Sequence, residues 1–218
     1  MGIVFGKTGV AEPAFDQLLV RSSASLPYEI RRYGIRYAIE TEFAIGQQSA
    51  GFRALAGYIG VGTAPQNEGS VSVAMTAPVV TENSGEKIAM TAPVVMSSDK
   101  QMKRMQFILP EEYDDISKIP KPTNSKVSIK KVAAGTGAAH KFSGFVNDEI
   151  AENKARELAK QLKEDGVDVS EEEVLNKYDL WQFHPPFTLG PLRRNEIWVD
   201  LSSEQVDILL KKYQNEKK

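Results

Sequence analysis

The side chains that most often carry metal or nucleophilic chemistry are scarce in this sequence. It contains no cysteine and two histidines, His140 and His184, which lie far apart in the chain. Thiolate metal sites, disulfides and cysteine nucleophiles are therefore excluded, and the histidines lack the helical spacing that would bring both to one metal ion. No catalytic triad, paired carboxylates or phosphate-binding glycine loop is recognisable. The sequence therefore favours a binding protein over an enzyme, with no intrinsic metal.

The heptapeptide Ala-Met-Thr-Ala-Pro-Val-Val occurs twice, at residues 74–80 and 89–95. Methionine sulfur is a soft axial ligand of haem iron, so Met75 and Met90 are candidate ligands, although methionine more often fills a core. Proline removes a ladder donor, the valine pair favours a strand, and the Asn-Ser-Gly between the copies favours a turn. The repeat contains no charged or nucleophilic group. We therefore interpret the two copies as neighbouring scaffold strands of one meander.

The elements that must position any site follow the same order in both halves of the chain. The runs with strand or helix periodicity are residues 26–43 (two strands), 47–62 (helix), the two heptapeptides, 102–110 (strand), 127–145 (two strands), 147–166 (helix), 177–184 (strand) and 195–201 (strand). The sequence thus predicts an α+β fold, a distorted antiparallel β-barrel of two pseudo-symmetric ββαββ-like halves with two main helices.

The chain is expected to form one principal domain over residues 26–205. An N-terminal extension, 1–25, precedes it, and a polar, solvated tail, 206–218, follows it. The net charge of −2 gives no support to a nucleic-acid partner, and no apolar run is long enough to cross a membrane. We expect a cytoplasmic monomer.

Five short motifs together resemble the SOUL haem-binding protein family. They are YEIRRY, GYIG, KIAMTAPV, FSGF and HPPFTLGPLRRNEIWVDL, in the family's order, over about residues 26–202. MTAPV and PPF…RRNEIW are the specific ones, and the tandem heptapeptide is similar to the plant and algal cytosolic members. The resemblance implies the same distorted barrel. It also implies non-covalent, reversible binding of haem or related tetrapyrroles, for buffering or intracellular transport and without catalysis.

The resemblance further implies a ligand site between the first helix and the loop before the last strand. A porphyrin needs an apolar shelf and cations at its rim. The contacts expected on this basis are Phe52, Arg53, Leu55, Ala56 and Ile59 from the helix, and Phe187, Thr188, Leu189, Arg193 and Arg194 from the loop. Plain core packing is the alternative for Leu55 and Ile59. A salt bridge to Glu196 or Asp200 is the alternative for the two arginines.

Three further residues have assigned candidate roles. Some family members are proposed to ligate iron through an early histidine, which this chain lacks, so His184 is the candidate axial ligand. Glu196 and Trp198 share a strand face, and related effector-binding barrels hold cationic ligands with an acid among aromatic rings. The alternative for this second pocket places Trp198 in the core and pairs Glu196 with an arginine.

Three functions remain open on the sequence. The first is a tetrapyrrole carrier or buffer that passes haem to a protein acceptor. The second is an enzyme that processes a bound tetrapyrrole or other small molecule, with Glu196 or His184 as the acid–base group. The third is an adaptor that contacts another protein through the amphipathic helix at 148–164.

Overall fold

The computed structural model describes residues 10–82, 102–184 and 188–214. Within them the strands are β1 Phe15–Arg21, β2 Tyr28–Tyr33, β3 Arg36–Ala44, β4 Val79–Glu82, β5 Met102–Ile108, β6 Ser128–Val132, β7 Gly135–Phe142, β8 Asp179–Gln182 and β9 Asn195–Asp200. The α-helices are α1 Gln48–Ile59, α2 Asp148–Glu164, α3 Glu171–Lys177 and α4 Ser203–Gln214. Short 3₁₀ helices occupy Glu68–Ser70 (η1), Ile116–Lys118 (η2) and Gly190–Leu192 (η3).

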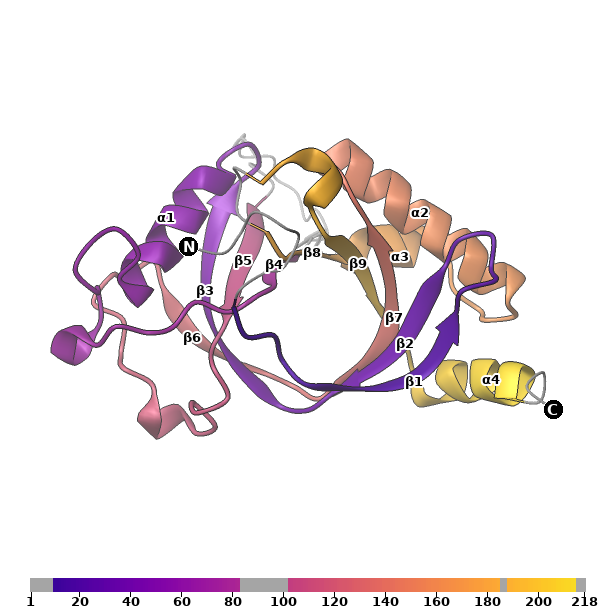
Figure 1. Cartoon of the computed structure of the whole chain (residues 1–218), viewed down its shortest axis with the longest axis horizontal. Helices are drawn as coiled ribbons and strands as arrows, with labels where there is room; N and C mark the ends of the chain where they lie inside the picture. Colours follow the sequence, from indigo (N-terminus) through magenta and orange to yellow (C-terminus); the bar gives the residue numbers. More distant parts are fainter. Residues whose placement is uncertain (1–9, 83–101, 185–187, 215–218) are drawn as a thin grey trace, which may run out of the picture.

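All these strands belong to one antiparallel sheet in the order β1-β2-β7-β9-β8-β4-β5-β3-β6. The sheet curls around its own inner face but does not close, because β1 and β6 remain as its two edges (Figure 1). The predicted α+β class and distorted, barrel-like sheet are confirmed. The chain has two further helices, α3 and α4, beyond the two that were predicted.

The two predicted ββαββ halves exchange their first strands. In the sheet order, β7-β9-β8 of the second half mirrors β3-β5-β4 of the first half, and β4 meets β8 at the centre. β2 pairs with β7, and β6 pairs with β3, so each half places its first strand beside the other half. The halves therefore build one sheet together.

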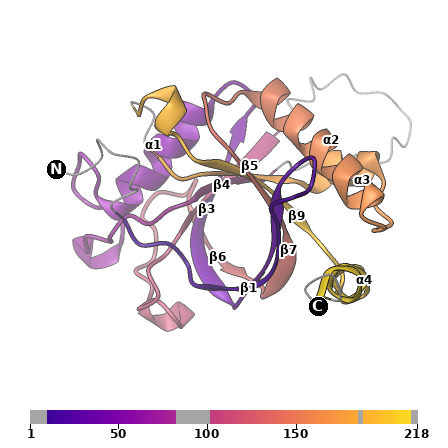
Figure 2. The ribbon, with the colours of Figure 1, turned by 45° about the vertical axis from the view of Figure 1, so that its right-hand side comes forward.

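The helices cover the outer face of the curled sheet (Figure 1 and Figure 2). α1 lies against β3 and β5 and ends at Gly60, whose φ of 86° is the left-handed conformation that glycine adopts readily. α2 begins at Asn147, whose side chain accepts a hydrogen bond from the Ile150 N–H at 2.8 Å. Ser170 and Glu173 form a capping box at the start of α3. Both predicted main helices are confirmed.

The buried side chains form three clusters, two outside the sheet and one inside it. One outer cluster packs under α2 and α4, and the other packs under α1. The inner cluster is aromatic: Trp181 stacks on Trp198 at 5.0 Å between ring centroids, and Tyr33 meets both rings edge-on at 5.3 and 5.4 Å. The inner face is therefore partly filled by side chains rather than open throughout.

Both ends of the chain take part in the fold. The segment expected as a solvated tail forms α4, which buries Val206, Leu209 and Tyr213. The Tyr213 hydroxyl donates to Asp165 at 2.7 Å, and the Tyr28 hydroxyl donates to the same carboxylate at 2.5 Å. Burial opposes ionisation of Asp165, but these hydrogen bonds and Arg21 outweigh it and lower its pKa. The N-terminal extension likewise contributes β1 to the sheet.

The first heptapeptide enters the sheet, as expected of a scaffold segment. Its valine pair begins β4, which has β5 on one side and β8 on the other. The predicted pairing of the two copies involves residues 89–95, which lie outside the described residues. Met75 is half-buried against the cluster under α1, as expected of a core filler, and Met90 lies outside the described residues.

Candidate functional site

A large cleft opens on the inner face of the sheet, and we call it the main cleft. Its volume is about 1110 Å³. The β1–β2 hairpin contributes Val20 and Pro27, β7 contributes Lys141 and Phe142, and the connection between β8 and β9 contributes Leu192. Clefts of this size hold drug-sized or cofactor-sized ligands.

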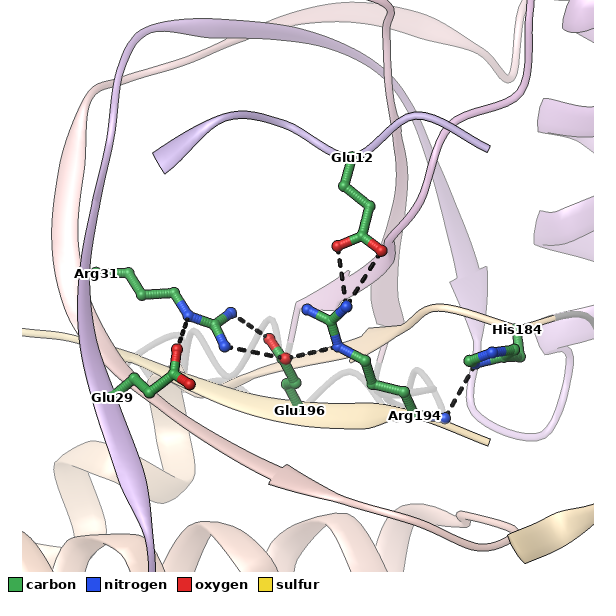
Figure 3. Close-up of polar contacts among 6 residues, drawn as sticks. All are labelled: Glu12, Glu29, Arg31, His184, Arg194 and Glu196. Atoms are coloured by element: carbon green, nitrogen blue, oxygen red, sulfur yellow. Dashed lines mark hydrogen bonds and ion pairs between the residues drawn. The ribbon is translucent and has the colours of Figure 1, made fainter. Parts of the chain in front are cut away.

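A buried ion pair forms the floor beneath this cleft. Glu196 on β9 is fully buried, and its two oxygens accept hydrogen bonds from the terminal nitrogens of Arg31 on β2 at 2.7 and 3.2 Å (Figure 3). Burial disfavours the charge on Arg31, but Glu196 outweighs this effect and raises the pKa of Arg31. The Arg31 Nε also donates to Glu29 at 2.7 Å, which lowers the pKa of Glu29 against the opposing effect of burial.

Arg194 joins this buried pair to the surface of the cleft. Its Nε donates to Glu196 at 2.9 Å, and its guanidinium lies over the Phe183 ring at 3.7 Å. Its Nη1 donates to both carboxylate oxygens of Glu12 at 3.1 and 3.0 Å. The alternative that paired Arg194 with Glu196 is therefore present in the structure, and Glu12 is an additional partner from the N-terminal segment.

His184 lies beside this network with a defined pattern of hydrogen bonding. Its Nδ1 accepts the backbone N–H of Arg194 at 3.0 Å, so the neutral ring carries its proton on Nε2. This buried Nε2 has no hydrogen-bond partner among the described residues. A protonated ring nitrogen cannot ligate iron, so ligation by His184 through Nε2 requires the loss of the Arg194 bond.

The connection between β8 and β9 presents an apolar and cationic edge. Arg193 donates through Nε to the Thr188 carbonyl at 2.8 Å, and its guanidinium lies over the Phe145 ring at 4.1 Å. Phe145 and Leu189 are largely exposed, at 65% and 70%. Thr188 is buried, and Phe187 lies outside the described residues. Arg193 also lines the main cleft, so this part of the predicted site borders it.

The predicted residues of α1 divide between core and surface. Leu55, Ala56 and Ile59 are buried against β3 and β5, which is the core alternative. Phe52 is half-buried and meets the Phe107 ring edge-on at 5.3 Å, whereas Arg53 is exposed. α1 contributes no residue to the main cleft. Of the five predicted α1 contacts, the structure leaves Phe52 and Arg53 accessible to a surface ligand.

Glu196 and Trp198 share the inner face of β9, as predicted from their spacing. The Glu196 carboxylate forms ion pairs with Arg31 and Arg194. Trp198 is buried in the inner aromatic cluster, and its Nε1 donates to Asp200 at 2.8 Å. This arrangement is the structural alternative that the sequence left open. A cationic ligand would have to displace an arginine to reach the Glu196 carboxylate.

Comparison with known proteins identifies the family. The family model described as SOUL heme-binding protein matches residues 10–84 and 81–200, which includes the strands and helices of both halves. The chain belongs to the SOUL heme-binding protein family. This result confirms the resemblance drawn from the five sequence motifs.

Individual relatives of this SOUL family chain are distant. Heme-binding protein 2 of Mus musculus is 27% identical over 211 residues, covering 90% of this chain and 93% of that protein. An uncharacterized conserved protein from Listeria innocua is similar in structure with a TM-score of 0.50 and 11% identity, over 80% of this chain and 91% of that one. The EcmrR C-terminal domain gives a TM-score of 0.47 at 11% identity, over 82% and 98%. At this identity the Listeria structure supports the fold alone.

The SOUL family fold brings into the site several residues that the sequence analysis did not assign. Glu12, Glu29, Arg31 and Lys141 all line the main cleft. The spacing of Glu29 and Arg31 on one predicted strand was a usable signal, because alternate residues of a strand share a face. Glu12 gave no such signal, since its partner Arg194 is distant in sequence.

The described residues contain neither a cluster of metal-binding side chains nor a membrane-spanning helix. No group of three or more histidine, cysteine, aspartate or glutamate side chains among them could hold a metal ion. No helix in the part of the chain that the structure describes is long and apolar enough to cross a membrane.

Proposed function

We propose that this SOUL family protein binds haem or a related tetrapyrrole reversibly and non-covalently, as a buffer or carrier. The observation that carries the proposal is the main cleft, which combines room for a large ligand with both apolar and cationic walls. The name of the mouse relative supports the same class of ligand. We further propose that the protein acts as a monomer and passes its ligand to a protein acceptor.

The residues of the main cleft fit the chemistry of a porphyrin. The macrocycle is a flat apolar disc, for which Val20, Phe142 and Leu192 offer apolar contact. Its carboxylates need cations near the rim of the disc, and Lys141 and Arg193 are two cationic residues that line the cleft. Bound haem would supply the iron, and the His184 Nε2–H would offer a hydrogen bond rather than a ligand. We propose that Phe52 and Arg53 lie at most at the outer edge of the bound disc.

Titration with haem, followed by Soret absorbance, tests both the function and the position of the site. Wild type should give a saturable shift at micromolar haem. Lys141→Glu reverses one charge in the cleft and should weaken binding about fivefold. Lys131→Glu is the matched control, because Lys131 is also an exposed lysine on the sheet but does not line the main cleft. It should change the affinity by less than about twofold.

Four results would change the proposal. No saturable shift for wild type would overturn haem binding. A loss of affinity in Phe52→Ala with Arg53→Ala, together with an unchanged Lys141→Glu, would move the site to α1. An unaltered spectrum in His184→Ala is expected, and a lost or shifted Soret band would show that His184 ligates the iron. Steady consumption of the bound tetrapyrrole would show that the protein is an enzyme rather than a carrier.

A further inference from the structure

Two of the ion pairs that involve arginine at the main cleft differ sharply in exposure. The side chains of Arg31 and Glu196 are 3% and 0% exposed, whereas those of Arg194 and Glu12 are 22% and 30% exposed. Breaking a buried pair leaves a desolvated charge, which is strongly unfavourable. A partly exposed pair contributes little to stability and can exchange with another anion. Glu29 is as exposed as Glu12 but its partner Arg31 is buried, so Glu12 is the exposed carboxylate of this network whose arginine is also partly exposed.

Arg194 is held in place by contacts that do not depend on Glu12. Its Nε is fixed by Glu196, and the Phe183 ring lies under its guanidinium. Figure 3 shows the guanidinium between the two carboxylates, with Glu196 on one side and Glu12 on the other. When Glu12 leaves, Nη1 remains directed toward the position of the lost carboxylate. Arg194 is thus preorganised to receive another one.

Glu12 reaches Arg194 from a segment that precedes the first strand. This segment is tied to the first heptapeptide, since the Ala77 N–H donates to the Ala11 carbonyl at 3.0 Å and Ala11 bridges Thr76. Glu12 lines the main cleft and also a second cleft of about 650 Å³. Glu12 therefore borders both clefts.

We propose that Arg194 is the receptor for a ligand carboxylate in the main cleft, and that Glu12 is the internal carboxylate that occupies it when no ligand is bound. The cleft is lined by four arginine and lysine side chains and two glutamates, so release of Glu12 increases its preference for an anion. The inference rests on the proposed function, because haem carries the two carboxylates that would compete with Glu12. It assigns Glu12 as a residue that sets affinity and specificity.

The test compares haem with its dimethyl ester, in which both carboxylates are blocked, in the full-length protein. Glu12→Gln removes the internal competitor and should bind haem about threefold to fivefold more tightly than wild type. Its affinity for the ester should stay unchanged, because the ester offers no carboxylate to Arg194. The difference between variant and wild type should shrink at high salt.

Glu29→Gln is the matched control. Glu29 lines the same cleft and is also 30% exposed, but it is paired with Arg31. An equal rise in haem affinity in both variants would show that only the net charge of the cleft matters, and it would overturn the assignment of Arg194. The assignment would also fail if Glu12→Gln raised the affinity for the ester as much as that for haem, or if it left the haem affinity unchanged. In each of these cases haem binding by wild type would still stand. If wild type binds no haem, both proposals fail.

Discussion

At the scale of single residues, Asp179 is the least favourably placed carboxylate on the inner face. It is paired in register with Glu82 on β4, and Asp200 on β9 is a second acidic neighbour. Burial and these two carboxylates raise its pKa well above the usual range, and Arg36 offsets only part of the effect. The pKa of Glu82 is also raised, by burial and then by Glu40. The folded state therefore resists ionisation at this position.

Asp179→Asn should stabilise the protein near neutral pH. The pKa of Asp179 is higher in the folded state than in the unfolded chain, so its contribution favours folding below the unfolded pKa of about 3.9 and is lost as the pH rises through the folded value. At a pH above both the folded and the unfolded pKa, each pKa unit of this rise lowers the free energy of unfolding by about 1.4 kcal/mol. Urea unfolding at pH 7.5 should show a higher free energy of unfolding for Asp179→Asn than for wild type, and this difference should disappear towards pH 4.

The control for this variant is Asp16→Asn, because Asp16 is an exposed aspartate on β1. It should change the free energy of unfolding by no more than about 0.5 kcal/mol at either pH. A loss of stability in Asp179→Asn at pH 7.5 would contradict the argument, since it would show that the charged carboxylate makes a net favourable contact.

At the scale of elements, α4 is the part of the fold whose role differs most from the sequence expectation. Leu209 is fully buried in the cluster under α2, whereas its neighbour Ile208 is 38% exposed. Leu209→Ala should therefore reduce the free energy of unfolding by about 2–5 kcal/mol. Ile208→Ala removes a similar aliphatic side chain from the same helix and should cost no more than about 0.5 kcal/mol. Equal losses in urea unfolding would show that α4 is not packed on the domain.

The sequence contained a signal for α4 that its polar end obscured. Helical spacing separates the apolar residues Val206, Leu209 and Tyr213. The polar run at the end of the chain, Lys-Lys-Tyr-Gln-Asn-Glu-Lys-Lys, instead indicates a solvated tail. α1 and α2 were predicted correctly because their apolar periodicity is long and ends in glycine. Local patterns thus predict an element well when its polar and apolar residues are clearly separated.

The site was less predictable than the elements that carry it. The bond between Arg194 and Glu196 joins residues two apart in the sequence, at the start of β9, so the sequence could suggest it. The bonds that Glu12 and Arg31 make to this pair cross 182 and 165 residues, and no local pattern encodes them. For α1, periodicity predicted an apolar face but could not decide whether β3 and β5 or a ligand would cover it.

At the scale of the whole molecule, the exchange of first strands makes the two halves depend on each other. Three of the strand pairings in the sheet join one half to the other: β2 with β7, β3 with β6, and β4 with β8. Without its partner, each half would expose the unpaired edges of these strands and the apolar residues on the inner face. The single principal domain over residues 26–205 stays a prediction, which division of the chain can test.

Division of the chain within the β5–β6 connection tests this dependence. Glu111 and Glu112 are exposed, so a cut between them leaves fragments 1–111 and 112–218 without removing core residues. Neither fragment alone should give a cooperative unfolding transition, because each lacks the strands that complete its part of the sheet. Mixed or coexpressed, they should form a one-to-one complex by size-exclusion chromatography and recover cooperative unfolding by circular dichroism. Cooperative unfolding of either fragment alone would instead identify two independent domains, and the exchanged strands would then be dispensable for folding.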